Sequence, residues 1–193
     1  MTPNNGVQSM QLIWPAEIYL PAYVSALERG WSPNNLRPEA ACEELGKIAS
    51  DPARFLEELV DREATGPPIP MPDDTFVPRL PGYRRWMWDG EFCGSIMLRW
   101  QRGTNALPSY CLGHIGYAVV PWKRRRGFAT LALKELLVAA AAEGLSCVEI
   151  TTTPDNFISQ RVIQANGGVF VEKFSKTAEY GGADELRFRI TLK

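Results

Sequence analysis

Four basic residues in a row, Lys123, Arg124, Arg125 and Arg126, stand directly before Gly127. Adjacent cations repel one another, so this run is costly unless an anion lies among them. The glycine permits a tight turn and lets an oxygen atom approach the main chain. The run therefore predicts an anion-binding loop, and the alternative is a solvated basic loop that binds nothing.

The segments on either side of the run favour the anion. HIGYAVV is rich in β-branched and aromatic residues and predicts a strand that ends at Pro121. Residues 128–143 are rich in alanine and leucine and predict a helix that ends at Gly144. A loop between a strand and a helix presents unpaired N–H groups and the positive end of the helix dipole, about half a charge, which suits phosphate. The G-x-x-x-x-G-K-[ST] and G-x-G-x-x-G patterns are absent, which argues against ATP hydrolysis and dinucleotide binding.

The other elements imply a mixed α/β (α+β) fold. Helical spacing predicts helices in 16–29 and 38–63, the second interrupted near Pro52, and the prolines of 66–82 predict a stiff loop. From residue 83 we expect a hairpin turning at Asp89-Gly90, the strand-loop-helix unit, a strand SCVEITTT, a helix FISQRVIQAN and a final hairpin. This order predicts one domain, with a mostly antiparallel sheet, a central parallel strand-helix-strand crossover and flanking helices.

Composition excludes several classes of protein. The chain has 21 basic and 22 acidic residues, whereas a nucleic-acid binder would be strongly basic. Its four cysteines are widely spaced and it has one histidine, so neither a disulfide framework nor a metal site is predicted. No run approaches the roughly 20 apolar residues of a membrane span, and the first residues do not read as a signal peptide. We expect a cytoplasmic protein.

Arg124-Arg125-Arg126-Gly127-Phe128-Ala129 resembles the R/Q-x-x-G-x-G/A signature of the GNAT superfamily of acyl-CoA-dependent N-acetyltransferases. HIGYAVVP is similar to the strand before that signature, and Asn156-x-x-Ser159 with VIQANGG is similar to the later helix and turn. The resemblance implies a GNAT-like domain over 1–193. It comprises a helical substrate-side segment (1–65), a proline-rich loop (66–82) and an acetyl-CoA-binding core (83–193).

The resemblance implies acetyl-CoA as cosubstrate and no metal. Main-chain amides from Arg125 to Thr130 would hold its pyrophosphate, and the main chain at 118–120 would pair with the pantetheine arm. Asn156 would contact the arm or the incoming amine, although capping the helix that follows is equally good chemistry. The expected cofactor-binding residues are Ala118, Val119, Val120, Arg124, Arg125, Arg126, Gly127, Phe128, Ala129, Thr130, Asn156 and Ser159.

Acetyl transfer needs a neutral amine, and a lysine-like amine with a pKa near 10.4 is mostly protonated at pH 7. His114 is the first candidate base, because its ordinary pKa of about 6.5 suits the task, and the alternative is a histidine bonded within the sheet edge. Glu149 and the hairpin residues Asp89 and Glu91 are the competing bases. Many GNAT enzymes carry a tyrosine seven residues after the asparagine to protonate the departing thiolate, and this chain has Ile163 there. Ser159, Tyr180 or bound water can replace it. The N–H of Val119 or Val120 is the expected oxyanion donor.

The predicted function is transfer of an acetyl group to a primary amine of a small molecule or peptide, by direct attack in a ternary complex. Two alternatives stay open: a non-catalytic acyl-CoA-binding or sensing protein, and an RNA-binding module that uses the basic run. The tryptophans at 86, 88, 100 and 122 either line an acceptor pocket or fill the core. The edge strands of the last hairpin favour a homodimer.

Overall fold

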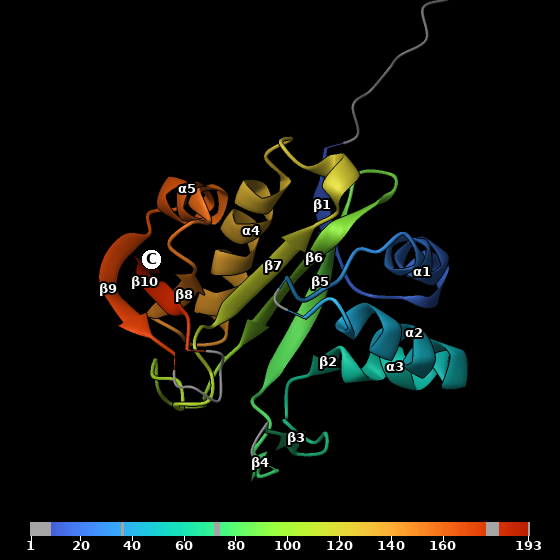
Figure 1. Ribbon diagram of the computed structural model, residues 1–193, viewed down its shortest axis with the longest axis horizontal. Coiled ribbons are helices and arrows are strands. Elements are labelled where there is room, and N and C mark those ends of the chain that lie inside the picture. The colour runs from blue at the N-terminus through green and yellow to red at the C-terminus, as the bar shows by residue number, and fades with distance from the viewer. Residues whose placement is uncertain (1–8, 36, 72–73, 177–181, 193) are drawn as a thin grey trace, which may run out of the picture.

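A meander of three antiparallel strands forms the main sheet (Figure 1). Its strands are β5 (Gly82–Trp88), β6 (Phe92–Arg99) and β7 (Ile115–Val119). Two short strands, β1 (Gln11–Ile13) and β2 (Val60–Asp61), pair with β5 on its other side. The computed structural model describes residues 9–35, 37–71, 74–176 and 182–192. The predicted hairpin at Asp89-Gly90 is confirmed by the β5–β6 ladder.

A second antiparallel sheet follows in the order β8-β10-β9. Its strands are β8 (Cys147–Thr152), β9 (Val169–Ser175) and β10 (Asp184–Thr191). The long helix α4 (Phe128–Ala142) crosses from β7 to β8, and α5 (Phe157–Ala165) connects β8 to β9. The predicted crossover is present, but β7 and β8 form no ladder in the described ranges, so the expected sheet is divided at this junction. The expected homodimer through the last hairpin stays a prediction.

The amino-terminal helices cover one face of the main sheet, and α4 and α5 lie on the other (Figure 1). They are a 3-10 turn η1 (Glu17–Tyr19), α1 (Leu20–Glu28), α2 (Ala40–Ser50) and α3 (Pro52–Glu58). Asp51 begins α3 because its side chain accepts the Arg54 N–H at 3.0 Å and Pro52 suits the first helical position. The helix ends at Glu58, earlier than expected, because β2 pairs with β5.

The proline-rich segment contains a small hairpin. Its strands β3 (Ile69–Pro70) and β4 (Phe76–Val77) pair with each other and with no other strand in the described chain. The prediction of a loop was therefore incomplete, although an isolated edge hairpin is a place where prolines are tolerated.

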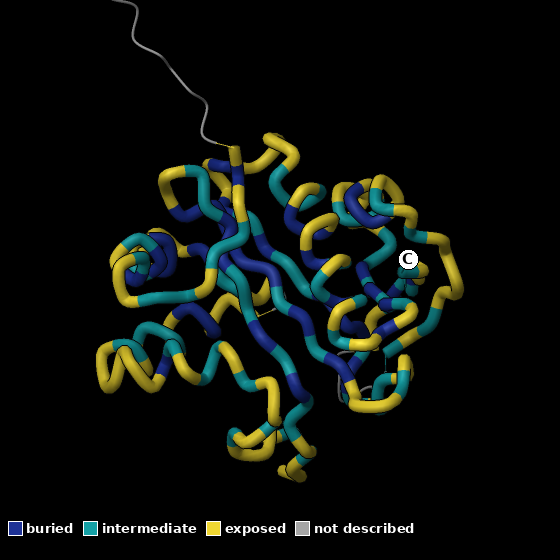
Figure 2. Tube along the Cα trace, turned by 180° about the vertical axis from the view of Figure 1, so that it is seen from behind, coloured by how far each residue is buried: buried dark blue, intermediate teal, exposed yellow. Residues whose placement is uncertain are grey.

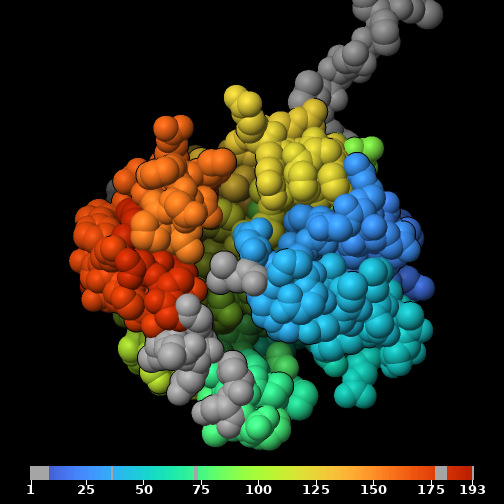
Figure 3. Space-filling model, in the orientation of Figure 1, coloured from blue at the N-terminus to red at the C-terminus, as the bar shows by residue number. Residues whose placement is uncertain are grey.

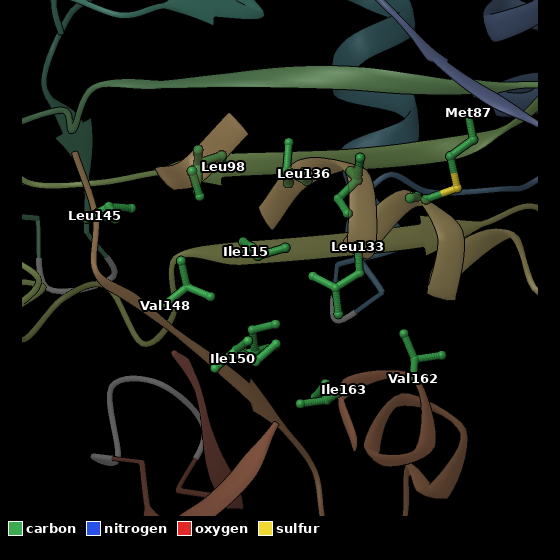
Figure 4. Packing of buried hydrophobic residues seen from close by; sticks show 14 of the residues in the cluster. Met87, Leu98, Ile115, Leu133, Leu136, Leu145, Val148, Ile150, Val162 and Ile163 are labelled. Carbon is green, nitrogen blue, oxygen red and sulfur yellow. The ribbon is translucent and has the colours of Figure 1, made fainter. Parts of the chain in front are cut away.

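Two apolar cores lie on opposite faces of the main sheet. One joins the sheets to α4 and α5, and its buried residues include Met87, Leu133, Ile150 and Ile163 (Figure 4). The other lies under the amino-terminal helices, where the rings of Tyr23 and Trp86 stack with centroids 4.6 Å apart. Figure 2 shows the central strands buried and the outer helices exposed on their far sides.

The tryptophans divide between core and surface. Trp86 and Trp100 are buried, Trp88 is half-buried, and Trp122 is exposed. Of these four, the first two fill the core, and Trp88 and Trp122 keep exposed surface that a ligand could contact. Within the described residues no helix combines the length and apolar character that crossing a bilayer requires.

Candidate active site

The loop before α4 passes twice through the left-handed region of backbone conformation. Gly127, at the N-cap of α4, has φ 77°, and Arg125 has φ 64°. Glycine adopts this conformation freely, whereas an arginine there is disfavoured by roughly 1–2 kcal/mol. In the described part of the chain, none of the main-chain N–H groups of residues 125–130 donates to a protein acceptor. This series of open donors at a helix N-terminus can bind the oxygens of a diphosphate.

Two of the four cations in this loop are neutralised by the β5–β6 turn. The Lys123 Nζ lies 2.9 Å from Asp89 Oδ1 and 2.7 Å from Glu91 Oε2, and Arg126 Nη1 lies 3.2 Å from Asp89 Oδ2. Burial raises the pKa of Asp89, but its bonds from Lys123 outweigh burial and hold that pKa below its usual value. Carboxylates of the chain therefore stabilise Lys123 and Arg126, and the prediction that the loop binds an external anion rests on its other residues.

The other two arginines are placed differently. The Arg124 Nε donates to the Val119 carbonyl at 3.2 Å, so this side chain closes the loop back onto β7. Arg125 is exposed and makes no ion pair or hydrogen bond within the described residues. Arg125 is therefore the cation of the run that is open to an anionic ligand.

Successive residues of β7 point their main-chain N–H and C=O groups alternately toward β6 and away from it. The Val120 N–H donates to a β6 carbonyl (3.0 Å), and the His114 carbonyl accepts from a β6 N–H (2.9 Å). Because bonded and non-bonded pairs alternate along an antiparallel ladder, Ala118 also faces β6, whereas Tyr117 and Val119 face away from it. Of the expected stretch 118–120, only Val119 presents main-chain groups toward β8. The Val120 N–H is already bonded and is excluded as an oxyanion donor.

The strands β7 and β8 meet at one end only. The His114 N–H donates to the Glu149 carbonyl at 2.7 Å, and the Glu149 N–H donates to His114 Nδ1 at 2.9 Å. The approach is close enough that a Cβ added at Gly113 would lie 3.2 Å from the Glu149 oxygen. Beyond this end no β7–β8 main-chain bond occurs in the described residues, so the N–H group of Val119 faces an opening.

The surface above this opening is hollowed. Figure 3 shows a recess between the α5 and β9 segments, orange and red, and the blue amino-terminal helices, with the olive chain near β7 at its base. On the helical side, the Asn35 Nδ2 donates to the Tyr117 carbonyl at 3.0 Å, and the Arg29 guanidinium stacks 3.4 Å from the Trp122 ring centroid. The connection between α1 and α2 therefore borders the opening.

His114 is a structural residue in this geometry. Its side chain is fully buried and its Nδ1 accepts the Glu149 N–H, while its buried Nε2 makes no hydrogen bond of normal geometry within the described residues. Burial lowers its pKa, because the charged imidazolium is poorly solvated there. The prediction of His114 as the base finds no support in this position, which matches the alternative of a histidine bonded within the sheet.

Glu149 is held by two arginines. Its carboxylate lies 2.6 Å from Arg187 Nη1 and 2.6 Å from Arg189 Nη2. Partial burial raises its pKa, but these arginines outweigh burial and bring the pKa below its usual value, which makes the carboxylate a weaker base. Together the three side chains line a cavity of about 400 Å³ bordered by the 105–112 loop. Glu149 therefore lies at the closed end of the junction and not in the opening.

The two α5 residues with predicted roles lie together at its N-terminus. The Asn156 Oδ1 accepts the Ser159 N–H at 3.0 Å, which confirms the capping role of Asn156. The Ser159 Oγ lies 2.8 Å from the Tyr117 hydroxyl across the opening. Tyr180, the other expected proton donor, lies outside the described residues. Ile163 is fully buried in the core, so this position presents no side chain to the opening.

Tyr117 is the site residue that the sequence analysis missed. Its side chain packs with the α4–α5 core, and its hydroxyl reaches Ser159 although 42 residues separate them. Strand alternation could have indicated this face, since Ile115, Tyr117 and Val119 share it.

A strand-loop-helix segment that can bind an anion thus lies beside a divided sheet. The chain matches the family model described as the Acetyltransferase (GNAT) family over residues 48–167, more than half its length. It therefore belongs to the GNAT family of acetyltransferases. A search of curated proteins by sequence found no match.

Solved structures share the fold at low sequence identity. RimL, the ribosomal L7/L12 α-N-protein acetyltransferase in complex with coenzyme A, is 14% identical, with TM-score 0.61 and coverage of 96% of this chain and 95% of that one. The microcin C7 self-immunity acetyltransferase MccE, in complex with acetyl-CoA and AMP, is 14% identical (TM-score 0.60; 95% and 92% covered). Mycobacterium smegmatis RimJ in complex with CoA-disulfide is 20% identical (TM-score 0.58; 94% and 81% covered).

The donor set suits the phosphate groups of coenzyme A. Open N–H groups and an unpaired arginine are anion ligands, and the described residues contain no group of three His, Cys, Asp or Glu side chains that could hold a metal ion.

Proposed function

We propose that this protein transfers an acetyl group from acetyl-CoA to a primary amine of a small molecule or peptide, by direct attack in a ternary complex. One observation carries the proposal: the open N–H groups of residues 125–130 lie at the end of β7 where β7 and β8 separate. An anionic tail bound in the loop would direct its attached arm along the Val119 edge of β7. We also propose that residues 1–193 act as one domain, with the amino-terminal helices on the acceptor side.

The chain's own groups divide the binding task. Main-chain N–H groups from Arg125 to Thr130 hold the diphosphate, and the Arg125 side chain adds a positive charge. The Val119 N–H is the open donor for the pantetheine arm or for the oxygen that gains charge during transfer. Arg124 orders the loop by bonding the Val119 carbonyl, and Phe128 and Ala129 pack against the core below it.

When bound, acetyl-CoA supplies the activated acetyl carbon and a thiolate leaving group. The residues around the opening align a neutral amine with that carbon, and alignment alone can lower a barrier by about 7 kcal/mol or more. Ser159 is the proposed donor of a proton to the departing sulfur. His114 and Glu149 hold the closed end of the junction, and the proton of the amine leaves through water or through Ser159.

The acceptor class is proposed from the relatives and from the recess. RimL is described as an α-N-protein acetyltransferase of L7/L12, and MccE is complexed with AMP. Peptides with free amino termini and nucleotide-linked amines therefore stand first in an acceptor panel, ahead of polyamines and aminoglycosides.

The proposal is tested by release of coenzyme A thiol from acetyl-CoA with each amine of the panel. We expect amine-dependent release at least tenfold above the rate with acetyl-CoA alone. Tight coenzyme A binding with no amine-dependent thiol release would instead support a non-catalytic acyl-CoA-binding protein, which Ile163 in place of the family tyrosine keeps as the second candidate. A salt-dependent RNA complex without coenzyme A binding would contradict both.

A further inference from the structure

The hydroxyl groups of Tyr117 and Ser159 form a pair across the opening between β7 and α5. Their oxygen atoms are 2.8 Å apart, and the Tyr117 hydroxyl also lies 3.4 Å from the Ser159 carbonyl. Both side chains are half-buried, so the pair stands at the boundary between the core and the recess. A hydrogen bond in this setting is shielded from competing water.

Both partners are fixed by other bonds. The Ser159 N–H is held by the Asn156 cap, which sets the first turn of α5. The Tyr117 carbonyl is held by Asn35, and the strand is fixed on its other edge by β6. The hydroxyl of Ser159 is therefore the mobile part, and Tyr117 is the side chain that restricts it.

We propose that Tyr117 is a positioning residue of the transfer reaction: its hydroxyl donates to Ser159 Oγ and so turns the Ser159 proton toward the departing sulfur. This inference rests on the proposed acetyl transfer. It gives Ser159, oriented by Tyr117 from β7, the task that a tyrosine on the later helix would perform, since the corresponding residue, Ile163, is buried in the core.

The bonds and protons of this step balance. The amine nitrogen forms a bond to the acetyl carbon, and the carbon–sulfur bond breaks with its electron pair on sulfur. Ser159 gives its hydroxyl proton to that sulfur and receives the proton that the nitrogen loses, so the products are an amide and a thiol. Tyr117 ends the step with the proton it began with.

The environment of Tyr117 favours this donor role. Burial raises its pKa to about 12, although the bond with Ser159 lowers it in part. The phenol therefore stays protonated at neutral pH and can remain a donor to Ser159 throughout the reaction.

Four proteins test the proposal: the wild type, Tyr117→Phe, Ser159→Ala and the double variant. With the best amine of the panel, we expect kcat to fall about tenfold for Tyr117→Phe and about a hundredfold for Ser159→Ala. The double variant should match Ser159→Ala within twofold, because Tyr117 acts only through that hydroxyl. The dissociation constant of coenzyme A, measured by calorimetry, should change less than twofold in all four. A multiplied loss in the double variant, about a thousandfold, would overturn the proposal.

Tyr110→Phe is the matched control. It removes a phenol hydroxyl that donates to Pro78 at 2.9 Å on an exposed loop, so kcat should not change. A second readout needs no turnover: in protein labelled at the tyrosine ζ carbon, Ser159→Ala should move the Tyr117 signal and leave the Tyr110 signal in place. An unmoved Tyr117 signal overturns the hydrogen bond itself. If the wild type binds coenzyme A and shows the Tyr117 shift but releases no thiol with any amine, the proposed transfer fails while the pairing stands.

Discussion

At the His114 end of the junction, β7 and β8 are joined through two hydrogen bonds to Glu149, whereas at the Val119 end their main-chain groups face an opening. The same kind of donor is thus satisfied by protein at one end and left for a ligand at the other. The side chains follow the same division. Glu149 is bound by two arginines at the closed end, and Arg125 is unpaired beside the open end.

This difference indicates that the closed end contributes to stability and the open end to coenzyme A binding. Buried donors without partners cost about 1–3 kcal/mol each, so the closed end should tolerate little change. The open donors at residues 125–130 face solvent and carry no such cost until a ligand covers them. Substitutions at the closed end should therefore act on unfolding, and substitutions at the open end on coenzyme A binding.

The largest expected effect is at the open end, where Gly127→Pro should lower coenzyme A affinity more than a hundredfold. Proline removes one of the open N–H groups and its φ near −65° conflicts with the observed 77°. The measurement is calorimetric titration with coenzyme A. Gly144→Pro is the control, because Gly144 has φ 89° at the far end of the same helix. Equal loss of affinity in both variants would mean that helix damage, not the loop, is responsible.

Second, His114→Ala should lower the free energy of unfolding by about 2–4 kcal/mol. The change leaves the Glu149 N–H without its acceptor and creates a cavity at a fully buried position. Urea unfolding measures the loss. Coenzyme A affinity and turnover per folded molecule should fall less than threefold, and a selective loss of turnover in the folded variant would restore His114 as the base.

Third, stability should decrease as the pH falls below about 6.5, by up to about 1.4 kcal/mol per pH unit. Burial lowers the pKa of His114 in the folded state, so the unfolded chain binds more protons in this range and protonation favours unfolding. The chain has one histidine, so a pH dependence of stability near pH 6.5 can be assigned to His114. Urea unfolding between pH 7 and pH 5 should show the slope in the wild type and lose it in His114→Gln. A slope that survives this substitution would contradict the assignment.

The smallest effect distinguishes neighbouring arginines. Arg125→Ala should weaken coenzyme A binding about fivefold, since it removes an unpaired cation, whereas Arg126→Ala should change it less than twofold because Arg126 pairs with Asp89. Both affinities are measured at low and at high salt, and the Arg125 effect should shrink at high salt. A larger loss for Arg126 would reverse the division of roles within the loop.

Local signals in the sequence predicted the local parts of this structure. The strand before the basic run, the long helix after it, the turn at Asp89-Gly90 and the cap at Asn156 all depend on residues close in the chain. The pairing of Lys123 with Asp89, 34 residues away, depends on tertiary contact, so the sequence analysis did not predict it.

The sequence also did not predict which way each β7 main-chain group points, because that direction depends on the register of β7 with β6. That register assigns Val119 to the opening and Val120 to the sheet. The burial of His114 has the same origin: its partner Glu149 lies on the strand beyond the crossover. The residue type suggested a base at this position, whereas the tertiary contacts of His114 favour a structural role.

Titration of the ¹⁵N-labelled protein with coenzyme A tests the central claim most directly. The account predicts that the amide signals of residues 125–130 and of Val119 shift most, while those of Val120 and Ala118, which are bonded within the sheet, change little. Saturable binding that leaves the 125–130 signals in place would contradict the assignment of this loop as the diphosphate site.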